Sequence, residues 1–560
     1  MDNSTKNSFK WKTLQHNGVA FPSPYLYKGL KIRIKNEELQ LNEEQEELVY
    51  AWAKKKDTHY INDIIFQKNY LFDLKKLLPQ RFKDIDSITD IDFSEIFRKV
   101  EEEQKIKLLE QENIKSLPKE EKKKNSEIKR KEREKLKEFY GKAIVDGLEV
   151  EVGNWLVEPP GLFMGRGLHP LRGRWKPRVS AQDVILNLGE DSPVPEGTWK
   201  NIVHDHYSTW LATWTENLTG KRKYVWLHDS ALLRQNKDRE KYDKAKRLEK
   251  YASKIQNAIF SKMNNAKDIN EKKIATVCYL ILKLAMRVGD EKDTDEADTV
   301  GASTLRVEHI KFPETSNGKK FMEFNFLGKD SVPWQKTIEI DSDDTKRLYD
   351  NLKFFMKDKE ITAEIFDNIN SAKVNAFLRN IDAKNVPGLT AKVFRTYLAT
   401  KIVKESLERP PIEVNKESSE IKKIYVAKIA NLKAAIECNH KKGIDPKNPA
   451  SKRSIERLEE SLSKKKERIH NLHKEIISRN WKTERQKIKI EATIEKITYQ
   501  LKLQQETRDY NLGTSLRNYI DPRVMKKWVD NVDLDWKKIY TTTLQRKFKW
   551  VEAEKLFDDS

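Results

Sequence analysis

Five side chains in the second half of the sequence are of the types needed to move a phosphodiester without a metal ion. In such a reaction the pentacoordinate transition state gathers negative charge on its non-bridging oxygens, and fixed cations must stabilise it. Arginine suits this task because its planar guanidinium donates paired hydrogen bonds and stays protonated. Lysine can protonate a departing oxygen, and tyrosine can form a stable phosphoester. The candidates, in chain order, are Arg287, Lys329, Arg395, His440 and Tyr519.

Three of these candidates are expected near the end of a helix or at the turn of a hairpin. Arg287 is predicted to end an apolar helix just before Gly289, a typical stop residue. Lys329 is predicted at the tip of a hairpin formed by FMEFNF and VPWQKTIEI. Arg395 is expected on the second turn of a helix that opens at Thr390.

The other two candidates follow helices, and each of the five has a simpler explanation when taken singly. His440 comes at the end of the amphipathic segment AAIECNH, and Tyr519 lies in SLRNYIDPR, beyond a long helical segment. An arginine at a helix C-terminus usually complements the helix dipole, and a histidine at a helix end usually caps it. A hairpin lysine is mostly solvated, and a tyrosine mostly packs in a core or on a surface. Only the combination, in this chain order, points to chemistry.

A long helical segment separates His440 from Tyr519. Across residues 451–508, apolar side chains recur at three-four spacing in two runs separated by the polar stretch WKTER. This pattern predicts two antiparallel helices packed as a coiled coil, with an apolar seam that we expect to be self-contained. Residues 451–510 hold 16 lysines and arginines against 10 aspartates and glutamates, so the segment is basic. A plain spacer or an oligomerisation arm would show the same pattern.

The first half of the chain is predicted to be a mixed α/β region. Residues 1–110 suit a small α/β globule, and the highly charged residues 101–139 predict an exposed helix pair broken at Pro118. Strand-like runs follow at DVILNL, STWLATWT and KYVWL, whereas helices dominate beyond Glu240. A chain of 560 residues is too long for one hydrophobic core, so roughly three or four domains are expected.

The composition favours a polyanionic partner. Lysine and arginine number 109 against 88 aspartates and glutamates, a net charge of +21, and each neutralised phosphate releases condensed counterions. Ribosome-associated and membrane-surface proteins are also basic. The chain has no GxxxxGK[ST] or GxGxxG phosphate loop, no CxxC pair and no compact acidic cluster, so we expect neither ATP nor a metal as a cofactor. Cys278 and Cys438 are expected to be reduced thiols, and no window suits a signal peptide or a membrane span, which favours an intracellular protein.

Longer distinctive stretches run from KWKTLQHNG near residue 10 to the C-terminus. They include EPPGLF, GRG, WTEN, RVGDEKDTDEADTVG, STLRVEHI, FNFLGKDS, GLTAKVFRTY, CNH and GTSLRNYIDPR. In these stretches and in their order, the chain resembles the eukaryotic-type IB DNA topoisomerases. The resemblance implies a monomeric enzyme, independent of ATP and metal, that relaxes supercoils of both signs in double-stranded DNA. It would act by transient cleavage of one strand, controlled rotation and religation.

The resemblance also implies a role for each candidate. Tyr519 would form a 3′-phosphotyrosyl link and free a 5′-hydroxyl. Arg287, Arg395 and His440 would stabilise the phosphorane, and Lys329 would protonate the leaving oxygen. Further positions match family residues that contact DNA, namely Arg166, His169, Lys223, Tyr224, Lys292, Thr299, Asp330 and Asn518. Among these, Arg166, Asp330 and Asn518 match positions where camptothecin-type inhibitors of the family bind.

A multidomain α+β DNA clamp is the fold that the resemblance implies. Residues 8–235 would form a mixed α/β capping half with two subdomains and the charged helical segment. Residues 236–442 would form a mainly helical catalytic core with a tyrosine-recombinase-like fold. Residues 443–510 would be the antiparallel coiled-coil linker, and residues 511–560 a C-terminal domain that carries the nucleophile.

Some positions depart from the family pattern. Met164 stands where close relatives carry a basic residue, Asp290 replaces an asparagine, and RTYLAT lacks the usual Asn-Ala after its tyrosine. These departures bear on drug affinity and on fine DNA contacts. The long charged N-terminal tail of eukaryotic members is absent, so we expect a compact, archaeal-type form in the cytoplasm or nucleoid. A eukaryotic member would instead lie in the nucleus.

Two other functions share parts of this pattern. A tyrosine site-specific recombinase uses the same Arg–Lys–Arg–His–Tyr set, but it would normally assemble as a tetramer and would not need the capping half predicted in residues 20–230. A basic architectural protein would bind duplex DNA without cutting it.

Overall fold

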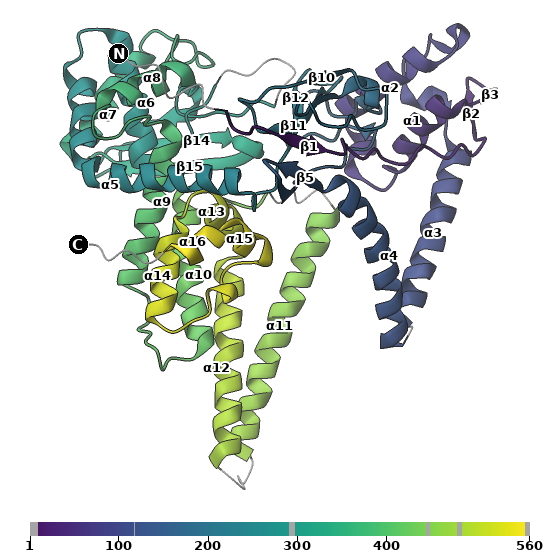
Figure 1. The fold of residues 1–560 in the computed structure, drawn as a ribbon. Helices are drawn as coiled ribbons and strands as arrows, with labels where there is room; N and C mark the ends of the chain where they lie inside the picture. Colours follow the sequence, from purple (N-terminus) through teal and green to yellow (C-terminus); the bar gives the residue numbers. More distant parts are fainter. Residues whose placement is uncertain (1–8, 117, 291–296, 444–448, 479–483, 555–560) are drawn as a thin grey trace. The chain divides into compact units, whose positions relative to one another are not determined.

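The computed structural model describes residues 9–116, 118–290, 297–443, 449–478 and 484–554. The chain divides into two compact units (Figure 1). The first comprises residues 1–235 together with residues 294–297, and the second comprises residues 236–293 and 298–560. Among the described residues, no helix is both long and apolar enough to span a membrane.

The first unit is built from short strands and four helices within its described residues. Its helices are α1 (Glu43–Ala53), α2 (Ile64–Leu77), α3 (Ser94–Ser116) and α4 (Lys119–Tyr140). Its strands are β1 (Leu14–His16), β2 (Lys31–Ile34), β3 (Glu37–Gln40), β4 (Ile91–Asp92), β5 (Lys142–Val145), β6 (Leu148–Glu151), β7 (Gly161–Leu162), β8 (Trp175–Lys176), β9 (Ile185–Asn187), β10 (Asn201–Val203), β11 (Trp210–Thr215) and β12 (Arg222–Trp226). They form sheets of order β1-β5-β6, β3-β2-β4, β7-β8 and β10-β9-β11-β12.

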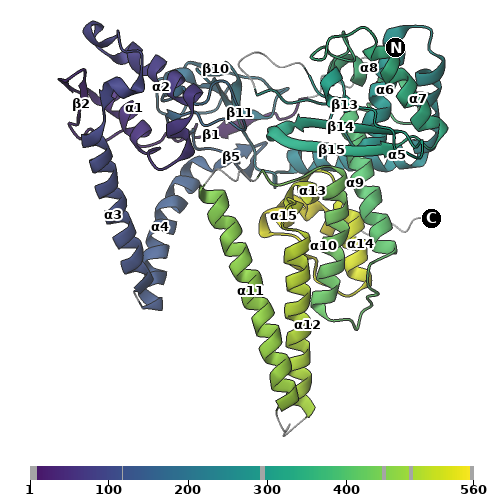
Figure 2. The ribbon, with the colours of Figure 1, turned by 180° about the vertical axis from the view of Figure 1, so that it is seen from behind.

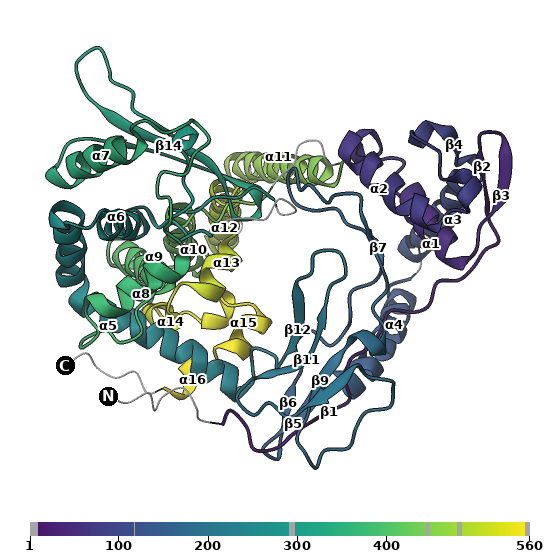
Figure 3. The same cartoon turned by 90° about the horizontal axis from the view of Figure 1, so that it is seen from above.

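Two separate hydrophobic cores hold this unit together. One surrounds α1 and α2, where the ring of Trp52 stacks on Tyr70 with centroids 4.4 Å apart. The other includes Leu186 of β9 and Trp214 of β11, two paired strands that lie side by side in Figure 3. The strands predicted from DVILNL, STWLATWT and KYVWL are confirmed as β9, β11 and β12. The highly charged segment forms α3 and α4, which lie on either side of Pro118 with mostly exposed side chains.

The second unit is mainly helical. Its helices are α5 (Leu232–Asn265, whose first residues belong to the first unit), α6 (Ile269–Leu284), α7 (Asp343–Met356), α8 (Ser371–Ile381), α9 (Ala391–Glu408), α10 (Glu420–Glu437), α11 (Pro449–Ser478), α12 (Glu484–Glu506), α13 (Leu512–Asn518), α14 (Pro522–Asn531), α15 (Thr542–Lys547) and α16 (Lys549–Ala553). Its strands are β13 (Ile310–Lys311), β14 (Phe321–Gly328) and β15 (Val332–Glu339), paired in that order.

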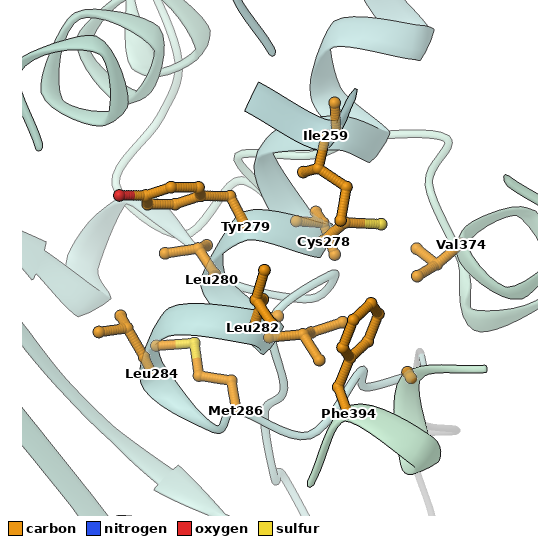
Figure 4. Close-up of a cluster of buried hydrophobic side chains, with 14 of the residues drawn as sticks. Ile259, Cys278, Tyr279, Leu280, Leu282, Leu284, Met286, Val374 and Phe394 are labelled. Atoms are coloured by element: carbon orange, nitrogen blue, oxygen red, sulfur yellow. The ribbon is translucent and has the colours of Figure 1, made fainter. Parts of the chain in front are cut away.

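Helix α6 lies at the centre of this unit's larger core. It is apolar around most of its circumference, which is the pattern of a helix buried on all sides. Figure 4 shows Cys278 and Leu282 of α6 among Ile259 of α5, Val374 of α8 and Phe394 of α9. Each of these side chains except Leu282 is completely buried. The core therefore fixes α9, which carries Arg395, against α6, which precedes Arg287.

The hairpin predicted around Lys329 is confirmed. Strands β14 and β15 pair antiparallel in register from Phe321–Glu339 to Gly328–Val332. The turn between them holds Asp330 and Ser331 at positive φ, 68° and 56°, which tightens the reversal.

The predicted C-terminus of the helix before Arg287 is wrong. Helix α6 ends at Leu284, and Ala285 adopts the left-handed conformation with φ 51°. The carbonyl oxygen of Ala285 accepts a hydrogen bond from the guanidinium of Arg395. Beyond it the carbonyl oxygen of Arg287 accepts from the backbone N–H of Ala302 at 2.8 Å. These tertiary partners replace the helical ones, so Arg287 lies on a segment without regular secondary structure.

Helices α11 and α12 run antiparallel and lie side by side in both Figure 1 and Figure 2. Lys465 of α11 contacts Gln504 of α12, and Gln504 Nε2 donates to Ser461 Oγ at 3.3 Å. The expectation of a self-contained apolar seam is wrong, because α12 also packs on α10. Tyr499 and Leu503 belong to an apolar cluster that includes residues of α10.

Candidate active site

Arg395 is, together with His440, the most deeply buried of the five candidates. It lies on the second turn of α9, as predicted, and only 4% of it is exposed. Its Nη1 donates to the carbonyl oxygen of Ala285, and its Nη2 donates to the carbonyl oxygen of Cys438 at 3.0 Å. Its Nε has no hydrogen-bond partner among the described residues. A buried donor without a partner costs free energy, so this Nε–H is available for an incoming anion.

His440 lies beside Arg395, three residues beyond Glu437, the last residue of α10. Its Nε2 is 3.5 Å from Nη2 of Arg395, and its Nδ1 is 2.7 Å from the hydroxyl oxygen of Ser515. Burial first, and then the charges of Arg395 and Arg287, lower the pKa of His440 from 6.5 to about 3. The imidazole is therefore neutral at physiological pH and can serve as a hydrogen-bond donor rather than as a charged group.

Tyr519 joins these two side chains through its ring. The ring stacks on that of His440 with centroids 5.1 Å apart, and the guanidinium carbon of Arg395 lies 5.1 Å from the Tyr519 ring centroid. Tyr519 is the C-cap residue of α13, and its backbone carbonyl accepts a hydrogen bond from Thr400 Oγ1 at 3.2 Å. Since Thr400 lies on α9, the same helix positions both Arg395 and the backbone of Tyr519.

Arg287 belongs to the same electrostatic environment. Burial, followed by the charge of Arg395, lowers the pKa of Arg287, and Tyr519 and Asp330 act in the opposite direction. Its segment is held by Ser303, whose hydroxyl lies 2.8 Å from the carbonyl oxygens of both Val288 and Gly289. Two neighbouring guanidinium groups repel each other, and an anion bound between them would relieve that repulsion.

Lys329 is exposed at the turn of the hairpin, and within the described part of the chain no direct contact places it against the other four candidates. Two links bring the hairpin to them. The carbonyl oxygen of Leu327 accepts from the backbone N–H of Val300 at 2.8 Å, close in sequence to the residues that hold Arg287. Lys336 of β15 forms a 2.6 Å ion pair with Glu437 at the end of α10. The hairpin is thus anchored on both sides of the site, with Lys329 at its free end.

The predicted DNA contacts in the second unit have different surroundings. Thr299 is half-buried next to Val300, and Asp330 is exposed in the hairpin turn. Asn518 is half-buried, and its Nδ2 donates to the carbonyl oxygen of Thr514 at 3.2 Å. Lys292 lies outside the described residues.

The remaining predicted DNA contacts lie in the first unit. Arg166 is exposed in the loop between β7 and β8, and the ring of His169 packs edge-on against Phe163 at 4.8 Å. Lys223 and Tyr224 are neighbours on β12, where the ring of Tyr224 lies 5.3 Å from that of Trp226.

Partly buried ion pairs fix the loop that carries Arg166 and His169. Arg172 pairs with Asp63 at 2.7 Å, and Arg174 pairs with Asp73 at the same distance. Asp63 is the N-cap residue of α2 and Asp73 lies within α2, so this helix holds the loop through contacts between residues far apart in the sequence.

Three positioning residues were not identified from the sequence. Ser515 contacts the His440 ring, Thr400 holds the backbone of Tyr519, and Ser303 holds the Arg287 segment. For Ser515 a local signal exists, because it precedes Tyr519 by four residues and so lies one helical turn away. Thr400 and Ser303 have no such signal. Among the described residues, no group of three or more His, Cys, Asp or Glu side chains is arranged to hold a metal ion.

Three family models match consecutive parts of the chain. The model described as "Eukaryotic DNA topoisomerase I, DNA binding fragment" matches residues 9–227, and "Eukaryotic DNA topoisomerase I, catalytic core" matches residues 230–476. "C-terminal topoisomerase domain" matches residues 491–558.

Individual relatives agree with these models. DNA topoisomerase 1 of Drosophila melanogaster is 35% identical over 97% of this chain and 54% of its own length. DNA topoisomerase 1 beta of Arabidopsis thaliana is 35% identical over 97% of this chain and 58% of its own length. The chain thus spans little more than half of these two relatives. DNA topoisomerase 1 of Homo sapiens is 34% identical over 97% of this chain and 70% of its own length. With consecutive models along its length and this identity to the human protein, the chain belongs to the eukaryotic DNA topoisomerase I family.

Proposed function

We propose that this protein is a type IB DNA topoisomerase that relaxes positive and negative supercoils without ATP or a metal ion. The observation that carries the proposal is the contact set around Tyr519, in which its ring lies 5.1 Å from both the His440 ring and the Arg395 guanidinium. A phenol beside fixed cations and a neutral imidazole is the arrangement that attack on a phosphodiester needs.

In the proposed reaction, the phenolic oxygen of Tyr519 attacks a DNA phosphorus atom. A 3′-phosphotyrosyl bond forms, and the bond from phosphorus to the 5′-oxygen breaks. Arg287 and Arg395 stabilise the charge on the non-bridging oxygens, and the neutral His440 donates a further hydrogen bond. The unpartnered Nε–H of Arg395 supports this assignment, since a phosphate oxygen would supply the missing acceptor.

Lys329 is the proposed general acid that protonates the departing 5′-oxygen. Its place at the turn of β14 and β15 supports this role, because a hairpin turn can reach into a groove of DNA while its base stays anchored. After rotation, the 5′-hydroxyl attacks the phosphotyrosyl phosphorus, Tyr519 departs and the strand is resealed.

The wider architecture that we propose follows the family. Residues 8–235 act as the capping half, and residues 236–442 as a catalytic core of tyrosine-recombinase-like fold. Residues 443–510 act as a coiled-coil linker, and residues 511–560 as the C-terminal domain. The partner is double-stranded DNA bound by a monomer. The residues proposed to contact it are Arg166, His169, Lys223, Tyr224, Lys292, Thr299, Asp330 and Asn518. Of these, Arg166, Asp330 and Asn518 would adjoin a camptothecin-type inhibitor in the cleavage complex.

Incubation with supercoiled plasmid in EDTA and without ATP tests the proposal. We expect a ladder of relaxed topoisomers, for both positively and negatively supercoiled plasmid. A recombinase acting only on a defined site would leave most plasmids supercoiled, and an architectural protein would shift their mobility only until it is removed. A plasmid that stays fully supercoiled after treatment with the folded protein would overturn the proposal.

A further inference from the structure

The hydroxyl of Ser515 is the closest polar neighbour of the His440 ring. Ser515 lies on α13 and is completely buried, and His440 is 4% exposed. The distance of 2.7 Å between Ser515 Oγ and His440 Nδ1 is that of a well-formed hydrogen bond. Within the described residues, this contact is the one hydrogen bond that the Ser515 side chain makes.

The direction of this hydrogen bond decides which ring nitrogen carries the proton. A neutral imidazole has one N–H, and its other nitrogen is an acceptor. If Nδ1 carried the hydrogen, it would donate to Ser515, and the buried serine O–H would have no acceptor among the described residues. If Ser515 donates to Nδ1, its hydrogen is satisfied and Nε2 carries the imidazole hydrogen. Because a buried hydroxyl without an acceptor is energetically unfavourable, the second arrangement is favoured.

The surroundings of Nε2 agree with this choice. The neighbour of Nε2 is Nη2 of Arg395 at 3.5 Å, and that nitrogen already donates to the carbonyl oxygen of Cys438. The Nε2–H and the unpartnered Nε–H of Arg395 are then two donors on neighbouring side chains. Together they can accommodate one anionic oxygen.

We propose that Ser515 is a positioning residue that fixes His440 in the Nε2–H tautomer, so that the ring donates a hydrogen bond to the substrate phosphate. Ser515 does not contact the substrate itself and acts through the His440 ring. This inference rests on the proposed function for its consequence in catalysis. The tautomer is a property of the protein without DNA and can be tested separately.

The first test is the tautomer of His440 in the full-length protein labelled with ¹⁵N at histidine. Two-bond proton–nitrogen correlation spectra distinguish Nε2–H from Nδ1–H imidazole, and the His440 signals are assigned by their loss in His440→Asn. We expect the Nε2–H pattern in the unmodified protein and a shift toward Nδ1–H in Ser515→Ala. Ser406→Ala is the matched control, because it deletes another buried hydroxyl of this unit that makes no hydrogen bond within the described residues. That variant should keep the Nε2–H pattern.

The second test is single-turnover cleavage of an oligonucleotide that cannot be religated. Loss of one donor to a transition-state oxyanion costs roughly 10²–10³-fold in rate. Ser515→Ala leaves the Nε2–H donor on only a minority of His440 rings, so it should slow cleavage by about 10- to 100-fold. Duplex affinity should be unchanged. In a His440→Asn background, Ser515→Ala should have no further effect, because the ring through which it acts is gone.

Three results would overturn the inference. They are an Nδ1–H pattern in the unmodified protein, an unchanged tautomer in Ser515→Ala, and an equal slowing by Ser515→Ala whether or not His440 is present. If the unmodified protein showed the expected tautomer but cleaved no DNA, the proposed function would fail while the tautomer assignment stood.

Discussion

At the scale of single residues, the phenolic oxygen of Tyr519 is the atom whose removal should separate cleavage from binding. Tyr519→Phe keeps the ring that stacks on His440 and faces Arg395, so the site should stay folded. Affinity for duplex DNA comes mainly from phosphate contacts and should be preserved. We expect no covalent protein–DNA adduct in denaturing gels and an unchanged dissociation constant. Adducts formed by Tyr519→Phe would show that another residue is the nucleophile.

The exposed Lys329 can be tested by changing the leaving group. Lys329→Ala should slow cleavage by roughly 10²–10⁴-fold, the usual contribution of a general acid. In a substrate with sulfur in place of the 5′-bridging oxygen, the thiolate leaves without protonation. The cleavage rate of Lys329→Ala on this substrate should therefore recover most of that loss. The exposed Lys319 at the other end of β14 offers a control, and Lys319→Ala should change neither rate. Equal impairment on both substrates would reduce Lys329 to an electrostatic contact.

His440 should make stability depend on pH. Its pKa is about 3 in the folded protein and 6.5 when unfolded, so unfolding takes up a proton at any pH between these values. The contribution of His440 to stability is therefore complete above pH 6.5 and declines as the pH falls toward 3. Between pH 7 and pH 5 the loss should reach about 2 kcal/mol at most.

Urea unfolding at pH 7 and at pH 5 measures the difference in the free energy of unfolding. His440→Asn should show a smaller difference between pH 7 and pH 5 than the unmodified protein. His473→Asn, which alters an exposed histidine on α11, should leave the difference unchanged. A pH dependence that is identical in all three proteins would place the His440 pKa close to its ordinary value.

At the scale of elements, the Arg287 segment depends on close backbone packing between two glycines. A Cβ built at Gly301 would lie 2.5 Å from both Cα and N of Gly289, so backbone atoms would have to move. Gly301→Ala should cost about 1–3 kcal/mol, the usual range for overpacking, and should slow cleavage by displacing Arg287. Gly443→Ala is the matched control, because a Cβ there meets no atom of the described residues within 4 Å. Unaltered single-turnover cleavage in Gly301→Ala would show that the position of Arg287 does not depend on this contact.

At the scale of the whole molecule, two parts of the α11–α12 pair have different expected roles. The distal part is residues 473–491, and the base is the remainder of the two helices together with the residues that flank them. At the base, Lys441 and Tyr510 form an isolated antiparallel β-bridge through their backbones. The backbone N–H of Asn511 donates to the carbonyl oxygen of His440 at 2.7 Å. Tyr425 of α10 also donates to Glu506 of α12 at 3.0 Å. The C-terminal end of α12 is therefore tied to α10 and to the residues next to His440.

Two deletions separate these roles. Excision of residues 473–491 through a short flexible linker keeps the base, so single-turnover cleavage should be retained. The loss of basic side chains should make plasmid relaxation distributive at lower salt than in the intact protein. Joining Lys447 to Asp509 also removes the part of α12 that packs on α10, and should slow cleavage. Equal cleavage by both variants would show that the base does not support His440 and Tyr519.

Local sequence patterns determined a large part of this protein. The alternation and turn of β14 and β15 predict their hairpin, and the three-four spacing across residues 451–508 predicts α11 and α12. Thr390 correctly marks the start of α9. These features arise from contacts between residues that are near in sequence, which impose a period of 2 or 3.6 on the chain. The family resemblance was also contained in the sequence, in motifs such as GTSLRNYIDPR.

Only the tertiary structure decided how the site is held together. The Arg395–Ala285 hydrogen bond, which accompanies the early end of α6, joins residues 110 positions apart, and the Ser515–His440 bond joins residues 75 positions apart. The packing of Tyr499 on α10 likewise depends on a partner outside the arm's own repeat. Such contacts leave no periodic signal, because each is made once, between side chains whose nearness depends on the packing of several helices. The sequence therefore names the reactive groups, and the fold decides their partners, their burial and the protonation state of His440.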